Sequence, residues 1–252
     1  MIPLPLLLSI GRDLGLDGKR SFRQDAIRYF THNKTKLQVE GLENIPQSGP
    51  FVITINHYYR PGFRAQWLAL AVSSQVPVDI HWIVTNELTF PNRWYGFIGR
   101  PVSRLILKRA ARIYGFTTMP PMPPRSRDAQ ARAASVRAVL NFIRSNAAPI
   151  IGLAPEGGDQ PHGIIRMPPS GLGRFALLLA EHGLQFLPVG IYEKDGSLCL
   201  NFGRRYALSV RDFATRDEVD LKASRTIMEH IAALLEEPLR GNFTSRPNAA
   251  MN

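Results

Sequence analysis

Apolar and polar positions follow two kinds of pattern along the chain of 252 residues. Short apolar runs bounded by turn residues alternate with longer stretches in which apolar residues recur at helical spacing. This alternation is typical of a layered domain in which helices cover a sheet. Several runs are apolar throughout, as in strands buried on both faces. The pattern predicts an α/β fold: a single domain whose mixed, mostly parallel sheet is covered by helices.

The predicted elements can be placed by residue range. Strands are expected at 37–40, 51–56, 79–85, 149–154, 186–192 and 198–202. Helices are expected at 21–31, 61–73, 95–114, 128–146, 171–182 and 219–237. Ser170 is the expected N-cap of the fifth helix and Gly183 its stop. The prolines of the run 119–125 exclude a helix or a central strand there.

Three parts of the chain differ in composition. Residues 1–34 form an apolar, helical N-terminal segment that can face a membrane, residues 35–240 the main domain, and residues 241–252 a flexible tail. The first ten residues are far shorter than the ~20 that a membrane span requires. A strand or coil packed on the core is the alternative for residues 1–10.

The positive charge is concentrated in one part of the chain. The formal net charge is +11, and the stretch from Arg100 to Arg144 holds nine arginines and one lysine against a single aspartate. This basic stretch therefore carries +9. A local excess of charge of this size suggests a local anionic partner.

Helical spacing places the cations Arg100, Arg104, Lys108 and Arg112 on one face of the helix predicted at 95–114. The apolar Val102, Leu105, Ile106 and Ile113 share another face. A basic amphipathic helix favours a membrane surface with anionic lipid as the partner, and a solvated helix back is the alternative. No nucleic-acid motif accompanies the charge, so no specific nucleic acid is expected.

Polar residues follow the strand predicted at 51–56. His57, Arg60 and Arg64 lie in the turn that leads into the next helix. Functional groups in α/β sheets collect at such strand ends, and a histidine there can act as a general base because its pKa lies near neutrality. A histidine bonded to the turn backbone is the alternative, and Arg60 and Arg64 either bind an anion or are solvated.

A second strand end carries an acid and two glycines. Glu156, Gly157 and Gly158 follow the strand predicted at 149–154. Adjacent glycines suit a tight turn as well as a close approach to a ligand. Glu156 is expected to be hydrogen-bonded or paired, because burial of an acid is otherwise costly. It can anchor the loop, orient a catalytic group or bind a substrate hydroxyl.

Other kinds of site receive little support from the sequence. The single Cys199 excludes a multi-cysteine zinc site, and no two histidines have the i, i+4 spacing of a zinc helix. No metal and no cofactor are therefore expected. The segment from Ser170 to Arg174 suits either an anion at a helix N-terminus or an ordinary helix cap.

The segments from about residue 37 to residue 200, taken in order, resemble the glycerolipid acyltransferase family that includes the lysophosphatidic acid acyltransferases. The resemblance rests on Val39-Glu-Gly-Leu-Glu-Asn-Ile-Pro, Asn56-His57, Ala154-Pro-Glu-Gly157 and Leu187-Pro-Val-Gly-Ile191. It implies a glycerolipid-acyltransferase-like fold over residues 35–240. It also implies that His57 removes a proton from an acceptor hydroxyl, which attacks the thioester of acyl-CoA or an acylated carrier protein.

The sequence departs from the family's motifs at two places. The aspartate that follows the histidine in the family falls on Gly62, and the Thr-Arg that follows Pro-Glu-Gly falls on Gly158 and Asp159. We expect Glu156 or a backbone carbonyl to take the role of the missing aspartate. Arg60, Glu156, Gly157 and Gly158 are the predicted substrate-binding residues.

The resulting prediction is an acyltransferase of lipid metabolism that acts on a hydroxyl or amine of a lipid or lipid-like acceptor, with His57 as general base. It is expected in the cytoplasm, peripheral on the inner face of a membrane. The alternatives are a catalytically impaired relative that binds lipid or an acyl carrier as an adaptor, and a polyanion-binding protein. The sequence leaves the acceptor, the donor and the oligomeric state open.

Overall fold

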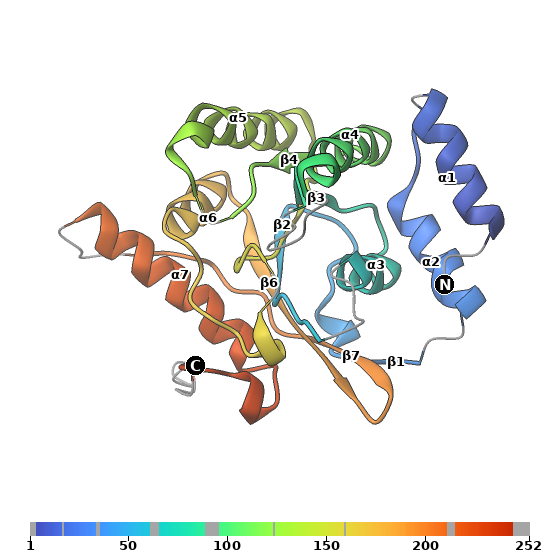
Figure 1. Ribbon diagram of the computed structural model, residues 1–252. Helices are drawn as coiled ribbons and strands as arrows, with labels where there is room; N and C mark the ends of the chain where they lie inside the picture. The colour runs from blue at the N-terminus through green and yellow to red at the C-terminus, as the bar shows by residue number, and fades with distance from the viewer. Residues whose placement is uncertain are drawn as a thin grey trace.

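Within the described residues, a seven-stranded sheet forms the middle layer and helices cover both of its faces (Figure 1). The computed structural model describes residues 4–16, 18–33, 36–60, 66–88, 96–122, 124–158, 160–210 and 215–243. The strands are β1 (Leu37–Glu40), β2 (Phe51–Ile55), β3 (His81–Thr85), β4 (Thr117–Met119), β5 (Ile150–Leu153), β6 (Gln185–Lys194) and β7 (Ser197–Phe202). The α-helices are α1 (Leu4–Leu16), α2 (Phe22–Asn33), α3 (Gln66–Gln75), α4 (Gly96–Tyr114), α5 (Ala129–Ser145), α6 (Leu172–Glu181) and α7 (Arg216–Ala232).

The strand order is β1-β7-β6-β2-β5-β3-β4, which places β2 at the centre. All neighbouring pairs in the sheet are parallel except β6 and β7, which form an antiparallel hairpin. This confirms the predicted α/β class with a mixed, mostly parallel sheet. Parallel neighbours also bring several strand ends to one edge of the sheet, where ligands commonly bind in such folds.

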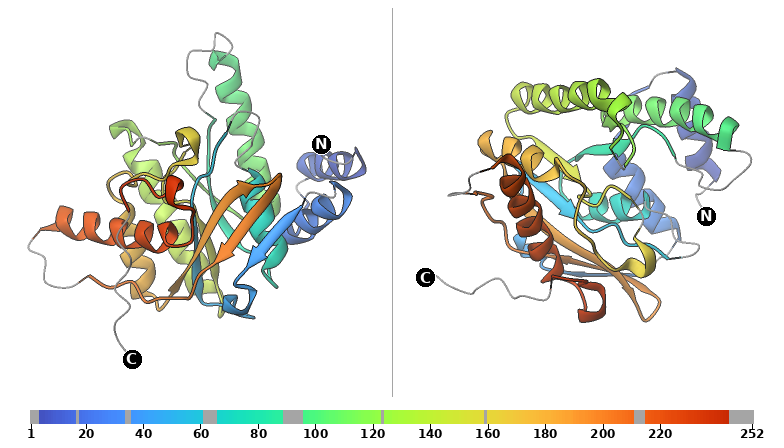
Figure 2. Two further views of the ribbon diagram at one scale, coloured as in Figure 1. Left: turned by 90° about the horizontal axis from the view of Figure 1, so that it is seen from below. Right: turned by 60° about the vertical axis from the view of Figure 1, so that its left-hand side comes forward.

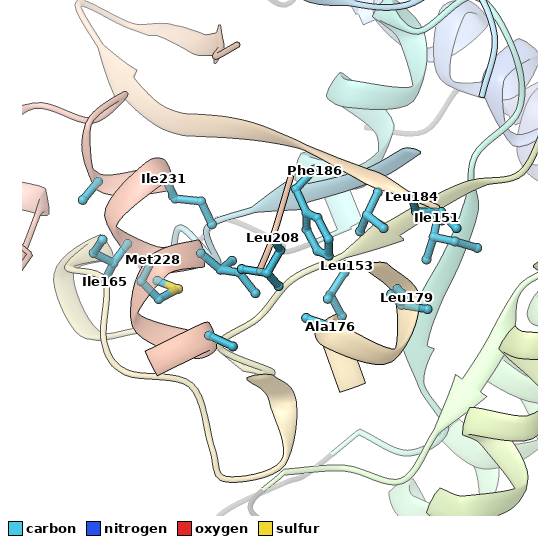
Figure 3. Close-up of a cluster of buried hydrophobic side chains, with 14 of the residues drawn as sticks. Ile151, Leu153, Ile165, Ala176, Leu179, Leu184, Phe186, Leu208, Met228 and Ile231 are labelled. Atoms are coloured by element: carbon cyan, nitrogen blue, oxygen red, sulfur yellow. The ribbon is translucent and has the colours of Figure 1, made fainter. Parts of the chain in front are cut away.

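The sheet is buried on both faces because its central strands are apolar throughout. Phe51 and Ile53 of β2 belong to the cluster formed with α3 and the partly buried phenylalanines of α2, whereas Val52 belongs to the cluster on the other face. Helices α5, α6 and α7 cover that second face. Figure 3 shows its side chains between β5, β6, α6 and α7, among them Leu153, Phe186 and Leu179.

Two local expectations differ from the structure, and one alternative that the sequence left open is excluded. The three-residue edge strand β4 was not predicted. Residues Leu4–Leu16 form helix α1, which decides against a strand or coil at the start of the chain. The N-cap of α6 is Gly171 and not Ser170. Its first-turn N–H groups are satisfied by a side chain from a distant helix, the carboxylate of Asp220 on α7, which accepts from the backbone N–H of Gly171 and Arg174 at 2.7 and 2.8 Å.

The predicted stop at Gly183 is confirmed, since this glycine has a φ of 81° just after α6. At the carboxyl end, Phe243 is buried in the core, and residues 244–252 of the predicted tail lie outside the described residues. Among the helices that the structure describes, none is long and apolar enough to cross a membrane.

Candidate active site

Strand register brings His57 and Glu156 together. Strands β2 and β5 are parallel neighbours, and Thr54 pairs with Leu153. His57 and Glu156 each lie three residues beyond this pair, so the two turns leave the same edge of the sheet side by side. Both residues therefore lie at the carboxyl edge of one sheet.

Glu156 connects two loops through its carboxylate. One oxygen accepts a hydrogen bond from the backbone N–H of His57 at 2.7 Å, and the other accepts from the backbone N–H of Arg166 at 3.0 Å. The side chain is buried. Glu156 therefore fixes the backbone of His57 directly, which makes it an anchor of the histidine turn.

Burial raises the pKa of the Glu156 carboxyl, because an apolar environment disfavours the charged form. The hydrogen bonds from His57 and Arg166 act in the opposite direction, since they stabilise the carboxylate. An acid held in this way combines a negative charge with a fixed position next to the histidine.

The residue before the histidine is held from the other side of β2. Asn56 is fully buried, and its side-chain amide donates to the carbonyl of Ile191 at 2.8 Å and accepts from the N–H of Ile191 at 2.7 Å. Asn56 thus bridges β2 to β6. The backbone around His57 is clamped by Asn56 on one side and by Glu156 on the other.

Arg60 forms an ion pair with Glu193 at the end of β6. Its Nε and one terminal nitrogen both contact the Glu193 carboxylate, the terminal nitrogen at 2.8 Å. The carboxylate raises the pKa of the Arg60 guanidinium, and burial together with the same carboxylate raises the pKa of Tyr58. Arg60 remains a predicted substrate contact, and a substrate anion would compete there with Glu193.

The two glycines after Glu156 differ in their surroundings. Gly157 has a φ of 69°, and a Cβ at this position would lie 2.6 Å from the side chain of Met122. Gly158 has open space where a Cβ would be. Gly157 is therefore required by the turn and by the close approach of the proline-rich loop, whereas Gly158 leaves room next to the site.

An apolar cavity of about 170 Å³ lies next to the Glu156 turn. Its walls come from the carboxyl ends of β3, β4 and β5, from the proline-rich loop, and from α5 and α6. Lining residues include Ile83, Met122, Val136, Pro155 and Phe175. The walls are mostly apolar, with Arg132, Thr85 and Ser170 as the polar exceptions, so the cavity suits an apolar group rather than a polar headgroup.

The Acyltransferase family model matches residues 36–192, more than half of the chain. The chain belongs to this acyltransferase family. The matched region contains both His57 and Glu156. Among solved structures, the 1-acyl-sn-glycerophosphate (LPA) acyltransferase PlsC from Thermotoga maritima is similar, at 16% identity and a TM-score of 0.47, over 84% of this chain and 78% of that chain. No curated protein matches the sequence.

The four predicted membrane contacts of this acyltransferase all lie on α4 and are exposed. Arg104 forms an ion pair with the buried carboxylate of Glu87, and its Nε lies 2.6 Å from a carboxylate oxygen. Arg100, Lys108 and Arg112 extend along the same helix. Arg104 therefore has a structural partner within the domain.

Some of the predicted site lies outside the described residues, namely Gly62, Arg64 and Asp159. Within the described part of the chain, no group of three or more potential ligands could hold a metal ion. The sequence left open whether an anion binds at the N-terminus of α6. In the structure, the carboxylate of Asp220 accepts the hydrogen bonds of the backbone N–H groups there.

Sequence reasoning missed the cavity walls and the role of Asn56. Asn56 carries a usable signal, because a polar residue that ends an apolar strand must find partners when it is buried. No signal in the sequence indicates the cavity, because its walls come from three strands, two helices and a loop spread between Ile83 and Phe175.

Proposed function

We propose that this acyltransferase moves a fatty acyl group from an acyl thioester to a hydroxyl or amine of a lipid or lipid-like acceptor, with His57 as general base. The observation that carries the proposal is the position of His57, anchored by the buried Glu156 at the sheet edge next to an apolar cavity. The Glu156 turn contacts His57 on one side and contributes Pro155 and Gly157 to the cavity wall on the other, which suits a reaction in which one reactant carries a hydrocarbon chain.

In the proposed reaction, the imidazole of His57 takes the proton of the acceptor hydroxyl as the acceptor oxygen attacks the thioester carbonyl carbon. The carbon–sulfur bond then breaks, and the departing thiolate of CoA or a carrier protein receives the proton from the imidazolium. No acyl-enzyme intermediate and no cofactor are needed. General-base catalysis of this kind is typically worth about 10²- to 10⁴-fold.

The cavity is proposed to hold part of the acyl chain. An engineered apolar cavity of about 150 Å³ binds a molecule the size of benzene, so the 170 Å³ here would take a few methylene groups. The rest of a long chain would extend along the apolar residues around the cavity or into the lipid phase.

Glu156 is proposed as the positioning residue in place of the aspartate that the family has at position 62. Its carboxylate holds the backbone of the histidine turn, and its negative charge lies near the imidazolium that forms during the reaction. The charge favours the protonated ring, because opposite charges at short range stabilise each other more strongly in a buried site than in water.

The proposed setting is the inner face of a membrane with anionic lipid. The exposed cations of α4 support this setting, since each basic residue near an anionic surface contributes on the order of 1 kcal/mol. An acceptor embedded in that surface would then reach the site without leaving the membrane.

The test is transfer of a labelled acyl group from a thioester to a lipid extract. His57→Ala should reduce the rate by about 10²- to 10⁴-fold, while the matched control His32→Ala, at an exposed position on α2, should leave it unchanged. Equal rates for His57→Ala and the unmutated protein would contradict the role of His57 as base. Absence of product from every variant would favour the alternative, an adaptor that binds lipid or an acyl carrier.

A further inference from the structure

The outer surface of α4 exposes five large apolar side chains. Phe97 is 70% exposed and Leu105 is 54% exposed, and Ile98, Val102 and Ile106 are exposed to a similar extent. An amphipathic helix of a globular protein normally turns its apolar stripe toward the core. On α4 the stripe faces outward, and such a continuous apolar surface is typical of a contact with a protein or a membrane.

The side of α4 that meets the protein carries mostly small residues. Ser103 and Ala111 are buried, and the Ser103 hydroxyl donates to the carbonyl of Arg100 and accepts from the N–H of Leu88. The buried large residue Ile113 lies in the last turn of α4. Small residues let the helix lie close to the domain, and the large apolar residues are left on the opposite side.

The exposed large apolar residues are confined to the amino-terminal half of α4, whereas exposed cations occur along the whole helix. The exposed apolar residues all lie between Phe97 and Ile106, where Arg100 and Arg104 are also exposed, and the exposed cations Lys108, Arg109 and Arg112 follow this stretch. In the left view of Figure 2, the amino-terminal half of α4 extends beyond the body of the domain. The half of α4 that carries the exposed apolar residues is therefore the outermost part of the helix.

We propose that α4 inserts the apolar side chains of its amino-terminal half into the interfacial region of an anionic membrane, while the exposed cations Arg100, Lys108, Arg109 and Arg112 contact the lipid headgroups. Interfacial helices bury their apolar side to a depth of roughly 5–10 Å. The ten residues from Phe97 to Ile106 span about 15 Å of helix, which is long enough for a tilted insertion of that depth. The basic residues favour a lipid surface over an apolar protein partner, because the charges match anionic headgroups.

This insertion would place the active site against the membrane. Residues Ile83–Thr85 at the carboxyl end of β3 line the cavity, and Glu87 and Leu88 just beyond them contact α4. The cavity edge and α4 are therefore linked by a short, bonded connection. The inference rests on the proposed function, because a lipid acceptor would explain why the active site lies at a membrane. Membrane binding itself can be measured without any acyl transfer.

The experiment is co-sedimentation with vesicles of phosphatidylcholine alone and of phosphatidylcholine with phosphatidylglycerol. Leu105→Asp should weaken binding to the mixed vesicles by roughly ten- to hundredfold, the value of burying one leucine. Leu221→Asp on α7 is the matched control, because Leu221 is also an exposed leucine, at 57% against 54%. It should bind as the unmutated protein does.

Equal binding by Leu105→Asp and Leu221→Asp would overturn the proposal. So would an unmutated protein that is a dimer by light scattering and becomes a monomer on Leu105→Asp, since the face would then be covered by a second copy. Failure of the proposed function gives a different result: His57→Ala would keep full activity, while vesicle binding and its loss in Leu105→Asp would be unaffected.

Discussion

Helices α4 and α5 both come from the basic stretch, yet they present opposite faces to the rest of the domain. On α5 the apolar Val139 and Ile143 are buried in the core, and exposed positions such as Arg137 carry the charge. On α4 the apolar Val102 and Ile106 are exposed together with the cations. Similar composition and similar helical period thus give one helix that covers the sheet and one that offers an apolar surface.

The difference follows from where each helix lies on the sheet. Helix α5 connects β4 to β5 across the face that α6 and α7 also cover, so its apolar side meets the core. Helix α4 connects β3 to β4 at the edge of the sheet and contacts α1 and β4 (Figure 1). An edge position leaves one side of the helix without protein to cover it, and a large apolar surface there requires another partner.

The comparison is tested most strongly by the same substitution in both helices. Ile143→Ala on α5 should cost about 3 kcal/mol of unfolding free energy, because it removes a buried side chain and leaves a cavity. Ile106→Ala on α4 should change stability by less than about 0.5 kcal/mol, because the side chain is exposed. Urea unfolding of the two variants measures both values. A comparable loss from both would mean that α4 is covered in solution.

The packing of α5 should also appear in the pH dependence of stability. The ring of Phe142 on α5 stacks on His81 at 3.8 Å, and burial lowers the pKa of His81 to about 4. The folded protein therefore keeps His81 neutral while the unfolded chain binds a proton below about pH 6.5, so stability falls as pH falls from 6.5 to 4.

The expected loss from His81 is roughly 2 to 3 kcal/mol. His81→Gln removes the titrating group and keeps a polar side chain at the position of the bond to Thr117. Urea unfolding at pH 7 and pH 4 should show a smaller decrease for this variant than for the unmutated protein. Parallel decreases would show that His81 is not held neutral beneath α5.

The smallest expected effects separate two cations of α4. Arg104→Gln leaves the buried Glu87 carboxylate without its ion pair and should cost about 1 to 2 kcal/mol of stability, less than a fully buried pair because Arg104 is largely exposed. Lys108→Gln should leave stability unchanged and weaken binding to anionic vesicles by about 1 kcal/mol, or roughly fivefold.

Urea unfolding of both variants measures their stability, and co-sedimentation with vesicles measures their membrane binding. The difference in vesicle binding should disappear at high salt, because exposed charges are screened. An unstable Lys108→Gln, or a stable Arg104→Gln, would reverse the roles assigned to these two cations.

Most of the fold could be predicted because the elements carry local signals. The apolar runs at β1, β2 and β5 and the helical periods of α2, α4, α5 and α6 lie within a few residues of their observed bounds. Strand β4 was missed because three residues next to a proline-rich loop show no period. Helix α1 was not distinguished from a strand or coil because two of the first five residues of the sequence are prolines.

The site could be predicted only in part. His57 and Glu156 stand out because each follows an apolar strand, but their contact depends on β2 and β5 being neighbours, which strand order decides. The ion pair of Arg60 with Glu193 joins residues 133 positions apart. No local pattern indicates such a partner, because it is set by where the end of β6 lies relative to the histidine turn.

The sequence alone determined the kind of element at most positions, the two-sided burial of the sheet and the two strand ends that carry chemistry. These are local properties, since periodicity and turn residues act over a few positions. Tertiary structure decided which charges are paired, where the apolar cavity lies and which of the two basic helices exposes its apolar side. Those outcomes depend on contacts between elements far apart in the chain, and the sheet edge beside α4 is the clearest case.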